Sequence, residues 1–182
     1  MKRGFSSLAF GVLASVALAL LLTGCASYHL GTGLPPEYRK IAIAEVQNLT
    51  EEARTTGLLR DRMAERLEAL PGLSVVSEKH AGLLLSLRVK SILQHNVART
   101  QARDSIDRHH DSDAYQTVLY RMVLTVEWSA CPKGKSEVVR KGVATGTADM
   151  PLMPDREMAF QNAIQEAVRD VATMISVQLT EE

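Results

Sequence analysis

The chain has 182 residues, of which 46% are hydrophobic and 23% are charged, and its formal net charge at pH 7 is zero. This composition is typical of one folded domain with a sizeable core and excludes an intrinsically disordered chain. The neutral balance argues against a general nucleic-acid binder and against a polybasic membrane surface, so we expect no nucleic-acid partner.

The N-terminal residues have the pattern of a secretory signal peptide. Two basic residues precede an apolar stretch from residue 8 to residue 22, which is too short to form a membrane-spanning helix. The segment Leu22-Thr23-Gly24-Cys25 at its end resembles the bacterial lipoprotein signal, in which the cysteine is acylated and the chain is cut just before it. We therefore expect a signal peptide over residues 1–24 and a lipid on the cysteine. An ordinary signal peptide with a chance cysteine is the alternative.

Acylation of Cys25 would leave Cys131 alone, because the chain has two cysteines, and no disulfide could form within the mature chain. An unpaired cysteine in an oxidising compartment can be a reactive thiol. We favour the other interpretation, in which Cys131 is a small buried hydrophobic residue at the end of a strand.

The first part of the mature chain predicts a tether and then a strand. Residues 25–38 contain glycines and prolines that indicate a tether, so we expect a single domain over residues 39–182. The apolar run from Ile41 to Val46 predicts a buried strand, and a turn is expected from Asn48 to Thr50.

The next residues predict a helix and a short strand. Large apolar side chains recur at intervals of three and four residues from Leu59 to Leu70, which places them on one face of a helix. Thr55 or Thr56 can cap its start, and Pro71-Gly72 can end it. The short strand is expected between residues 73 and 76.

The middle of the chain predicts a strand followed by a loop. Apolar and polar residues alternate from Leu83 to Lys90, which is typical of a strand with one apolar face. The alternation is lost from Asn96 to Ala114, so we expect a long loop there. Loops of this length in compact domains are often functional.

A hairpin is expected next. Strict alternation from Val118 to Trp128 predicts one strand, and residues 138–147 predict its partner after a turn at residues 132–135. Gly142 and Gly146 weaken the second strand, so it suits an edge of the sheet or a bulge.

The chain closes with a helix. Asp155 is a plausible N-cap, and an apolar stripe at helical spacing runs from Phe160 to Leu179. The order of elements is therefore β-α-β-β-β-β-α. This order indicates an α+β fold, a two-layer sandwich with two helices packed on one face of a mixed four- to five-stranded sheet.

Residues that could form an active site or a metal site are few. We find no Gly-x-Ser-x-Gly segment and no phosphate-binding loop. The run from His109 to Asp113 offers metal-ligand types, but neighbouring side chains on a loop seldom converge, so we interpret it as a solvated loop. Five methionines from Met122 onward are interpreted as core residues and not as copper ligands. We therefore expect that the protein is not an enzyme and that it binds neither a cofactor nor a metal.

Basic residues follow the middle strand into the expected loop. They are Arg88, Lys90, Arg99 and Arg103. Guanidinium and ammonium groups in this arrangement could hold the phosphates of an anionic lipid. The alternative is a solvated face, because aspartates are mixed with these cations.

Four short segments after the apolar stretch carry a family resemblance. They are Gly24 to Gly31, Leu34-Pro35-Pro36, Lys40 to Ile43 and Gln47 to Thr50. Together with the order of the later elements, they resemble the lipopolysaccharide-assembly lipoproteins of the LptE family. Ala81-Gly82 departs from the pattern, because the family often has an Ala-Asp pair there.

The resemblance implies an outer-membrane lipoprotein that is held by its N-terminal lipid and sits inside the β-barrel of LptD. There it would help to assemble the barrel and to pass lipopolysaccharide to the cell surface. Ala26 and Ser27 lack the aspartate associated with retention in the inner membrane, which agrees with an outer-membrane location. The resemblance also implies that Arg88, Lys90, Arg99 and Arg103 could contact lipopolysaccharide or the barrel.

A second class remains open, a lipoprotein that activates a peptidoglycan synthase. Such proteins also have a strand ending in Asn-x-Thr, then a helix and an alanine-led strand. They usually carry a long proline-rich stretch after the lipid, whereas the expected tether at residues 25–38 is short. An unrecognised enzyme is the third alternative.

Overall fold

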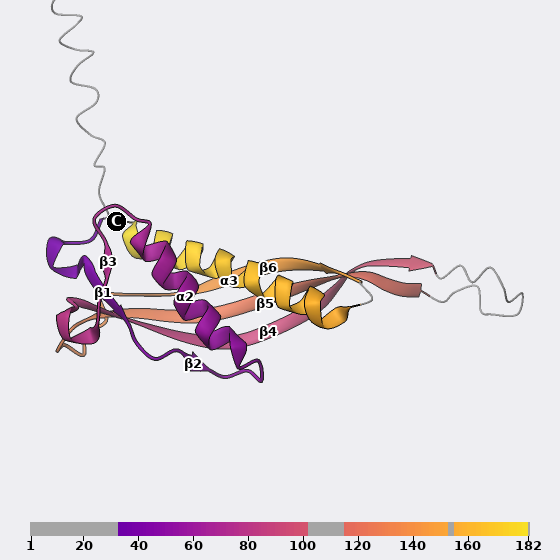
Figure 1. The fold of residues 1–182 in the computed structure, drawn as a ribbon, viewed down its shortest axis with the longest axis horizontal. Helices are drawn as coiled ribbons and strands as arrows, with labels where there is room; N and C mark the ends of the chain where they lie inside the picture. The colour runs from indigo at the N-terminus through magenta and orange to yellow at the C-terminus, as the bar shows by residue number, and fades with distance from the viewer. Residues whose placement is uncertain (1–32, 102–114, 153–154, 182) are drawn as a thin grey trace, which may run out of the picture. The chain divides into compact units, whose positions relative to one another are not determined.

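The computed structural model describes residues 33–101, 115–152 and 155–181, and these form one sheet with two helices on one of its faces (Figure 1). The signal segment, Cys25, Arg103 and the run from His109 to Asp113 lie outside the described residues. The elements are, in chain order, η1 (Pro36–Tyr38), β1 (Lys40–Ile43), β2 (Gln47–Asn48), α2 (Arg54–Glu68), β3 (Ser74–Val75), η2 (Glu78–His80), β4 (Leu83–Gln101), β5 (Tyr115–Pro132), β6 (Arg140–Pro151) and α3 (Arg156–Thr180).

The sheet is mixed and has the strand order β3-β1-β4-β5-β6. The short strands β1 and β2 pair with β4 in parallel, one after the other, whereas β4, β5 and β6 form successive antiparallel pairs. This arrangement confirms the α+β fold. It has six strands because Gln47–Asn48, expected at the edge of a turn, pairs with β4 as β2.

The core lies between the sheet and the two helices. Leu85 of β4 and Leu124 of β5 lie on the face of the sheet that the helices cover, and they share one core with Leu67 of α2 and Ile164 of α3. Each of the four side chains is at most 2% exposed. Fully burying one such side chain contributes roughly 1.5–3 kcal/mol. The helix phases and the apolar faces of both strands are therefore as the sequence predicts.

The start of α2 differs from the expectation. Ala53, and neither threonine, occupies the N-cap position, and Thr55 is fully buried inside the first turn with its hydroxyl unpaired. The reason lies just upstream, where the Asn48 side chain accepts from Thr50 N–H and donates to the Glu52 carbonyl. After this turn the helix begins at Arg54, so both threonines lie inside its first turn and not at its N-cap. The end is as expected, with Gly72 at φ +80°.

The closing helix α3 follows its sequence pattern. Asp155 caps it by accepting from Met158 N–H at 2.9 Å, as predicted. Its end is tied to the beginning of the described chain, because Gly33 N–H donates to the Thr180 carbonyl and Leu34 is buried in the core. No helix within the described residues is long and apolar enough to cross a membrane.

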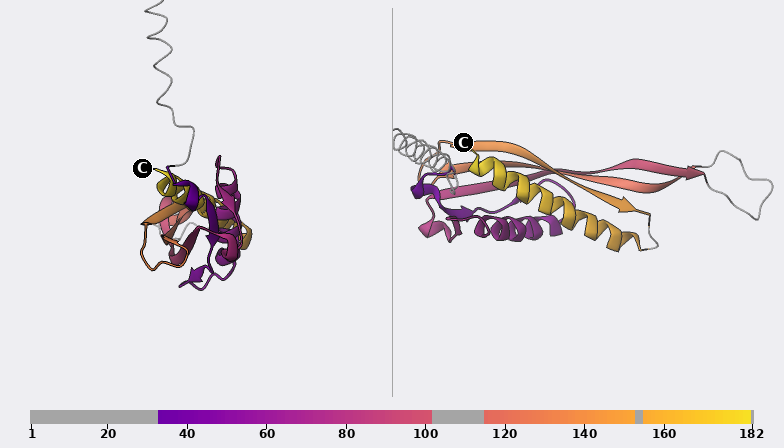
Figure 2. Two further views of the ribbon diagram at one scale, coloured as in Figure 1. Left: turned by 90° about the vertical axis from the view of Figure 1, so that its left-hand side faces the viewer. Right: turned by 90° about the horizontal axis from the view of Figure 1, so that it is seen from above.

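The expected loop from Asn96 to Ala114 is wrong in its first part. Strand β4 continues to Gln101 and stays paired with β5, forming an arm that extends past the helices (Figure 2). Register shifts interrupt the alternation between Val89 and Ser91 and twice between Asn96 and Arg99. Because neither α2 nor α3 covers the arm, no apolar face is required against them, and the sequence loses its strand signal.

Strand β6 is an edge strand, as its glycines predict, and its pairing with β5 runs without a register shift. The expectation that the methionines fill the core is correct for Met122, which is fully buried, and in part for Met150, which is half-buried against the core. Met153 lies outside the described residues. The expectation is wrong for Met158 and Met174, which are exposed on α3 because they lie outside its apolar stripe.

Candidate functional site: the open face of the sheet

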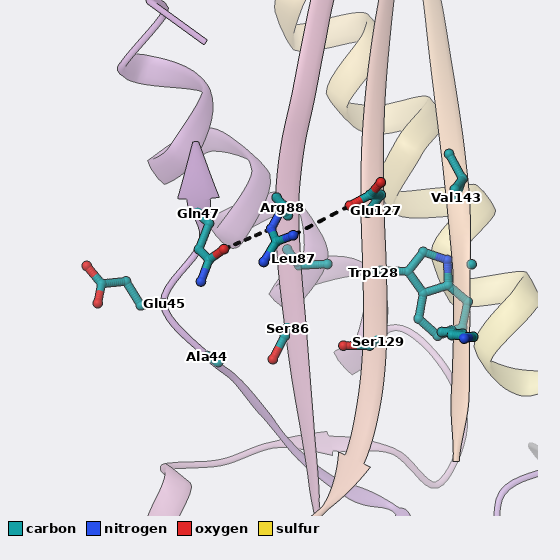
Figure 3. Close-up of a pocket in the computed structure, with 12 residues that line it drawn as sticks. Ala44, Glu45, Gln47, Ser86, Leu87, Arg88, Glu127, Trp128, Ser129 and Val143 are labelled. Atoms are coloured by element: carbon teal, nitrogen blue, oxygen red, sulfur yellow. Dashed lines mark hydrogen bonds and ion pairs between the residues drawn. The ribbon is translucent and has the colours of Figure 1, made fainter. Parts of the chain in front are cut away.

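The face of the sheet opposite the helices is open, and we call it the open face. Its central residues come from β4, β5 and β6. They are Ser86, Arg88, Lys90, Leu93, Val123, Thr125, Glu127, Ser129, Lys141, Val143, Thr145, Thr147 and Asp149. A shallow depression of about 800 Å³ lies over its middle and is bordered by Glu45 and Gln47 beside β4 (Figure 3).

Arg88 and Lys90 share one carboxylate. Arg88 Nη1 lies 3.8 Å and Lys90 Nζ 3.2 Å from the oxygens of Glu127, directly across on β5. Arg88 Nε also donates to the Gln47 side chain at 2.8 Å, so β2 fixes the guanidinium from its other side (Figure 3). Two cations on one anion leave a local surplus of positive charge.

This cluster of Arg88, Lys90 and Glu127 remains accessible, because each side chain is between two-fifths and half exposed. Exposed ion pairs contribute at most about 1 kcal/mol to stability, so the pairs orient the cations more than they hold the fold. An incoming anionic group can therefore compete with Glu127. Chemically, the cluster can bind a phosphate or carboxylate or meet a polar protein surface.

A second ion pair lies farther along the same face. Arg121 of β5 donates to both carboxylate oxygens of Asp149 on β6, at 2.6 and 2.9 Å. This hydrogen bonding holds the pKa of Asp149 below its ordinary value and raises the pKa of Arg121. The pair was missed from the sequence. The sequence indicates only that both residues lie on the polar side of their strands. It does not show that the register between β5 and β6 places them opposite each other.

The four predicted basic residues are not all brought together. Arg88 and Lys90 are neighbours on the open face, whereas Arg99 lies on the arm opposite Thr117. At about 3.3 Å per strand residue, Arg99 is roughly 30 Å or more from Arg88. Arg103 lies outside the described residues. The site in the described part of the chain is therefore narrower than predicted.

Cys131 is half-buried, not fully buried as expected. It shares the phase of Glu127 and Ser129 and so lies on the open face, which α2 and α3 do not cover. In the described ranges, no three histidine, cysteine, aspartate or glutamate side chains gather where a metal ion could bind.

No protein-family model matches the chain, and no curated protein matches it. Several solved protein structures are similar to it. One, from Helicobacter pylori and named as a neuraminyllactose-binding hemagglutinin homologue, is 13% identical, with a TM-score of 0.51 over 83% of this chain and 88% of that one. A minor lipoprotein from Acinetobacter baumannii is 12% identical, with a TM-score of 0.48 over 79% and 91% of the two chains. A protein from Caulobacter crescentus, named as a lipoprotein, is 16% identical, with a TM-score of 0.45 over 75% and 88%.

At 13% identity, the similarity to the Helicobacter pylori structure concerns the fold alone. It agrees with the two-layer arrangement of sheet and helices described above, and the open face has to be interpreted from its own residues.

Proposed function

We propose that this protein is a lipid-anchored outer-membrane protein of the LptE type that sits inside the β-barrel of an LptD-type partner. There it helps the barrel to assemble and assists export of lipopolysaccharide to the cell surface. The lipoprotein signal that ends at Cys25 supports the anchor, and the segments from Gly24 to Thr50 support the family.

The observation that carries the proposal is the mostly polar character of the open face, on which Leu93, Val123 and Val143 are the apolar residues. The interior of a membrane β-barrel is polar, so a protein that fills it needs a surface of hydrogen-bonding and charged groups. Serines and threonines on β4, β5 and β6 provide such groups, and the ion pairs at Glu127 and Asp149 remain exposed. The helices meanwhile bury the apolar face, so the chain can fold before it meets the barrel.

The surplus charge beside Glu127 has a role in this proposal. The head group of lipopolysaccharide is polyanionic, and Arg88 and Lys90 are oriented but not fully neutralised. They can contact its phosphates directly. If they instead meet polar residues of the barrel wall, their charge affects assembly and not lipid binding.

The peptidoglycan-synthase activator is the second candidate. The strand that ends in Asn48-Leu49-Thr50, followed by α2 and a strand led by Ala81, fits this class as well. In the structure, Asn48 and Thr50 bond to each other and form the turn before α2, which is a structural role that either class can use.

Depletion of the protein from its native cells distinguishes the two functions. The proposal predicts less folded LptD-type barrel, measured as a heat-modifiable band on gels, and less lipopolysaccharide at the surface. Incorporation of labelled peptidoglycan precursors should stay normal over the same period. Normal barrel levels with a fall in peptidoglycan synthesis would support the activator instead.

The anchor is tested separately. Mass spectrometry of the mature N-terminus should find an acylated Cys25, and Cys25→Ser should remove both the lipid and processing by the lipoprotein pathway. An unmodified N-terminus at another residue contradicts the anchor.

A further inference from the structure

The outer edge of β6 has unpaired backbone groups. Leu152 N–H donates to the Val118 carbonyl at 2.9 Å, and the pairing with β5 continues from there in unbroken register. Because hydrogen-bonding direction alternates along an antiparallel strand, the backbone groups of even-numbered β6 residues face β5 and those of odd-numbered residues face outward. Among the described residues, no strand pairs with this edge. We call its outward residues the edge strip, and they are Lys141, Val143, Thr145, Thr147 and Asp149.

The edge strip lacks the features that usually protect an edge. Natural edge strands carry a proline, a bulge or a central charge that prevents another strand from pairing. Between Lys141 and Met150, β6 has no proline and no register shift. The six residues from Val143 to Ala148 are uncharged, and charge occurs on the edge strip only at its two ends.

The position of α3 limits what can pair with the edge strip. The Ala167 carbonyl of α3 contacts Gly146, and Gln178 lies over Gly142, so the helix follows β6 along its length. An added strand would lie about 4.8 Å from β6. A second copy of this chain would bring its own α3 into this helix, so it cannot pair there. A single extended segment with no helix packed on it can.

Exposed apolar side chains flank the edge strip on both faces of the sheet. The residue Ile175 of α3 is fully buried on the inner side of the line that follows β6, whereas Met174 and Val177 on its outer side are 39% and 40% exposed. On the open face, Val143 is 54% exposed. A segment paired with the edge strip would therefore bury apolar surface on both sides and also gain backbone hydrogen bonds.

The charges at the two ends of the edge strip differ. Asp149 is paired with Arg121, whereas Lys141 is exposed and forms no ion pair within the described ranges. A hollow of about 580 Å³ adjoins Lys141 between the start of β6 and the end of α3. The edge strip therefore has an unbalanced positive charge at this end, which suits an acidic residue in the added segment.

We propose that the edge strip binds an extended segment of another polypeptide, which joins the sheet as an antiparallel strand beside β6. Only a polypeptide backbone matches N–H and C=O groups that recur at every second residue, and the antiparallel direction gives the more stable pairing. The segment has a small residue beside Gly146, apolar residues under Met174, and an acidic residue opposite Lys141. The inference goes beyond the proposed function and does not depend on it.

A synthetic peptide of this pattern, Lys-Val-Thr-Ala-Thr-Val-Thr-Val-Glu, is the probe, and it should bind the purified full-length protein in calorimetric titration. Its central threonine faces Thr145, so methylation of that amide nitrogen removes a donor to β6 and should weaken binding about tenfold. Methylation of the neighbouring alanine amide should not, because that N–H points away from β6. Equal binding of the two methylated peptides, or no binding of the parent peptide, overturns the proposal.

A proline in β6 provides the matching change in the protein. Thr145→Pro removes an outward N–H and leaves the hydrogen bonds to β5, so the variant should still fold, as circular dichroism can show. It should bind the parent peptide about tenfold more weakly. Thr145→Ala is the control, because it keeps the N–H and should bind like the wild type. A folded Thr145→Pro protein with wild-type affinity contradicts the proposal, and the methylated peptides decide the matter if that variant does not fold.

Amide exchange measured by NMR shows whether the edge strip is free in the full-length protein. Without peptide, the amides of Thr145 and Thr147 should exchange fast and those of Ala144 and Gly146 slowly, because only the latter face β5. The parent peptide should slow exchange at Thr145 and Thr147. Slow exchange at these two residues without peptide would mean that another part of this chain covers the edge, and it would overturn the proposal.

Discussion

Gly146 of β6 lies so close beneath the Ala167 carbonyl of α3 that no Cβ atom would fit between them. The glycine that weakens the strand is thus what allows the helix to approach the sheet. The close approach seats α3 on the edge strand, and the small residues Ala144 and Ala148 on either side are buried beneath the helix as well.

Replacing Gly146 by alanine should therefore destabilise the protein. The added methyl group would overlap a backbone carbonyl, which cannot rotate away, so we expect a loss of about 1–3 kcal/mol in the free energy of unfolding. Chemical denaturation followed by circular dichroism measures it. Thr147→Ala is the control, because that side chain is exposed on the open face. Equal midpoints for Gly146→Ala and the wild type would contradict the close approach.

The indole of Trp128 donates to the Gln178 side chain at 2.9 Å, beneath α3. Gln178→Leu would leave this buried donor unpaired and should cost about 1–3 kcal/mol. Trp128 is the one tryptophan in the chain, so its fluorescence reports both the unfolding transition and the change around the ring. Gln165→Leu, at an exposed position of α3, should change neither. An unaltered emission spectrum in Gln178→Leu would argue against the hydrogen bond.

The pair Arg121–Asp149 predicts a pH dependence. The hydrogen bonds from Arg121 hold the pKa of Asp149 below its ordinary value, so the carboxylate form is favoured in the folded protein. Its contribution to stability is present above the pKa of the unfolded state and is lost as the pH falls through the lower pKa of the folded state. Titration of the Asp149 carboxyl by NMR should give a midpoint below that of an ordinary aspartate. In Arg121→Gln the midpoint should return to the ordinary range, and a midpoint that does not move would contradict this account.

Reversing both charges at Arg88 and Lys90 tests their proposed contact with lipopolysaccharide. The double variant Arg88→Glu, Lys90→Glu should lose lipopolysaccharide binding, because three carboxylates would then face the phosphates. Adding Glu127→Lys restores the ion pairs with the opposite surplus, so the triple variant should fold well and still fail to bind. Binding and barrel assembly are measured side by side. Unchanged binding in the folded triple variant would remove the direct contact.

Much of the fold is predictable because its signals are local. The alternation in β5, the stripe on α3 and the cap at Asp155 each depend on residues a few positions apart, and all three are confirmed. The arm beyond Asn96 is different. Its strands are held by pairing with each other and not by a buried face, so bulges and polar residues remove the pattern that identifies a strand.

The candidate site was predictable only in part for a related reason. Arg88 and Lys90 could be assigned to the polar side of one strand from alternation alone. Their shared partner Glu127 depends on the register between β4 and β5, which a bulge shifts at Val89. Gln47 reaches Arg88 only because β2 pairs beside it, across 41 residues of sequence.

The central claim is that this protein works inside an LptD-type barrel. The most direct test is purification of the tagged, lipidated protein from detergent-solubilised outer membranes, with the bound proteins identified by mass spectrometry. The account predicts that an LptD-type barrel copurifies in equal amount, and that Cys25→Ser reduces its yield. Recovery of the intact, acylated protein without such a barrel, or with a peptidoglycan synthase in its place, would contradict the claim.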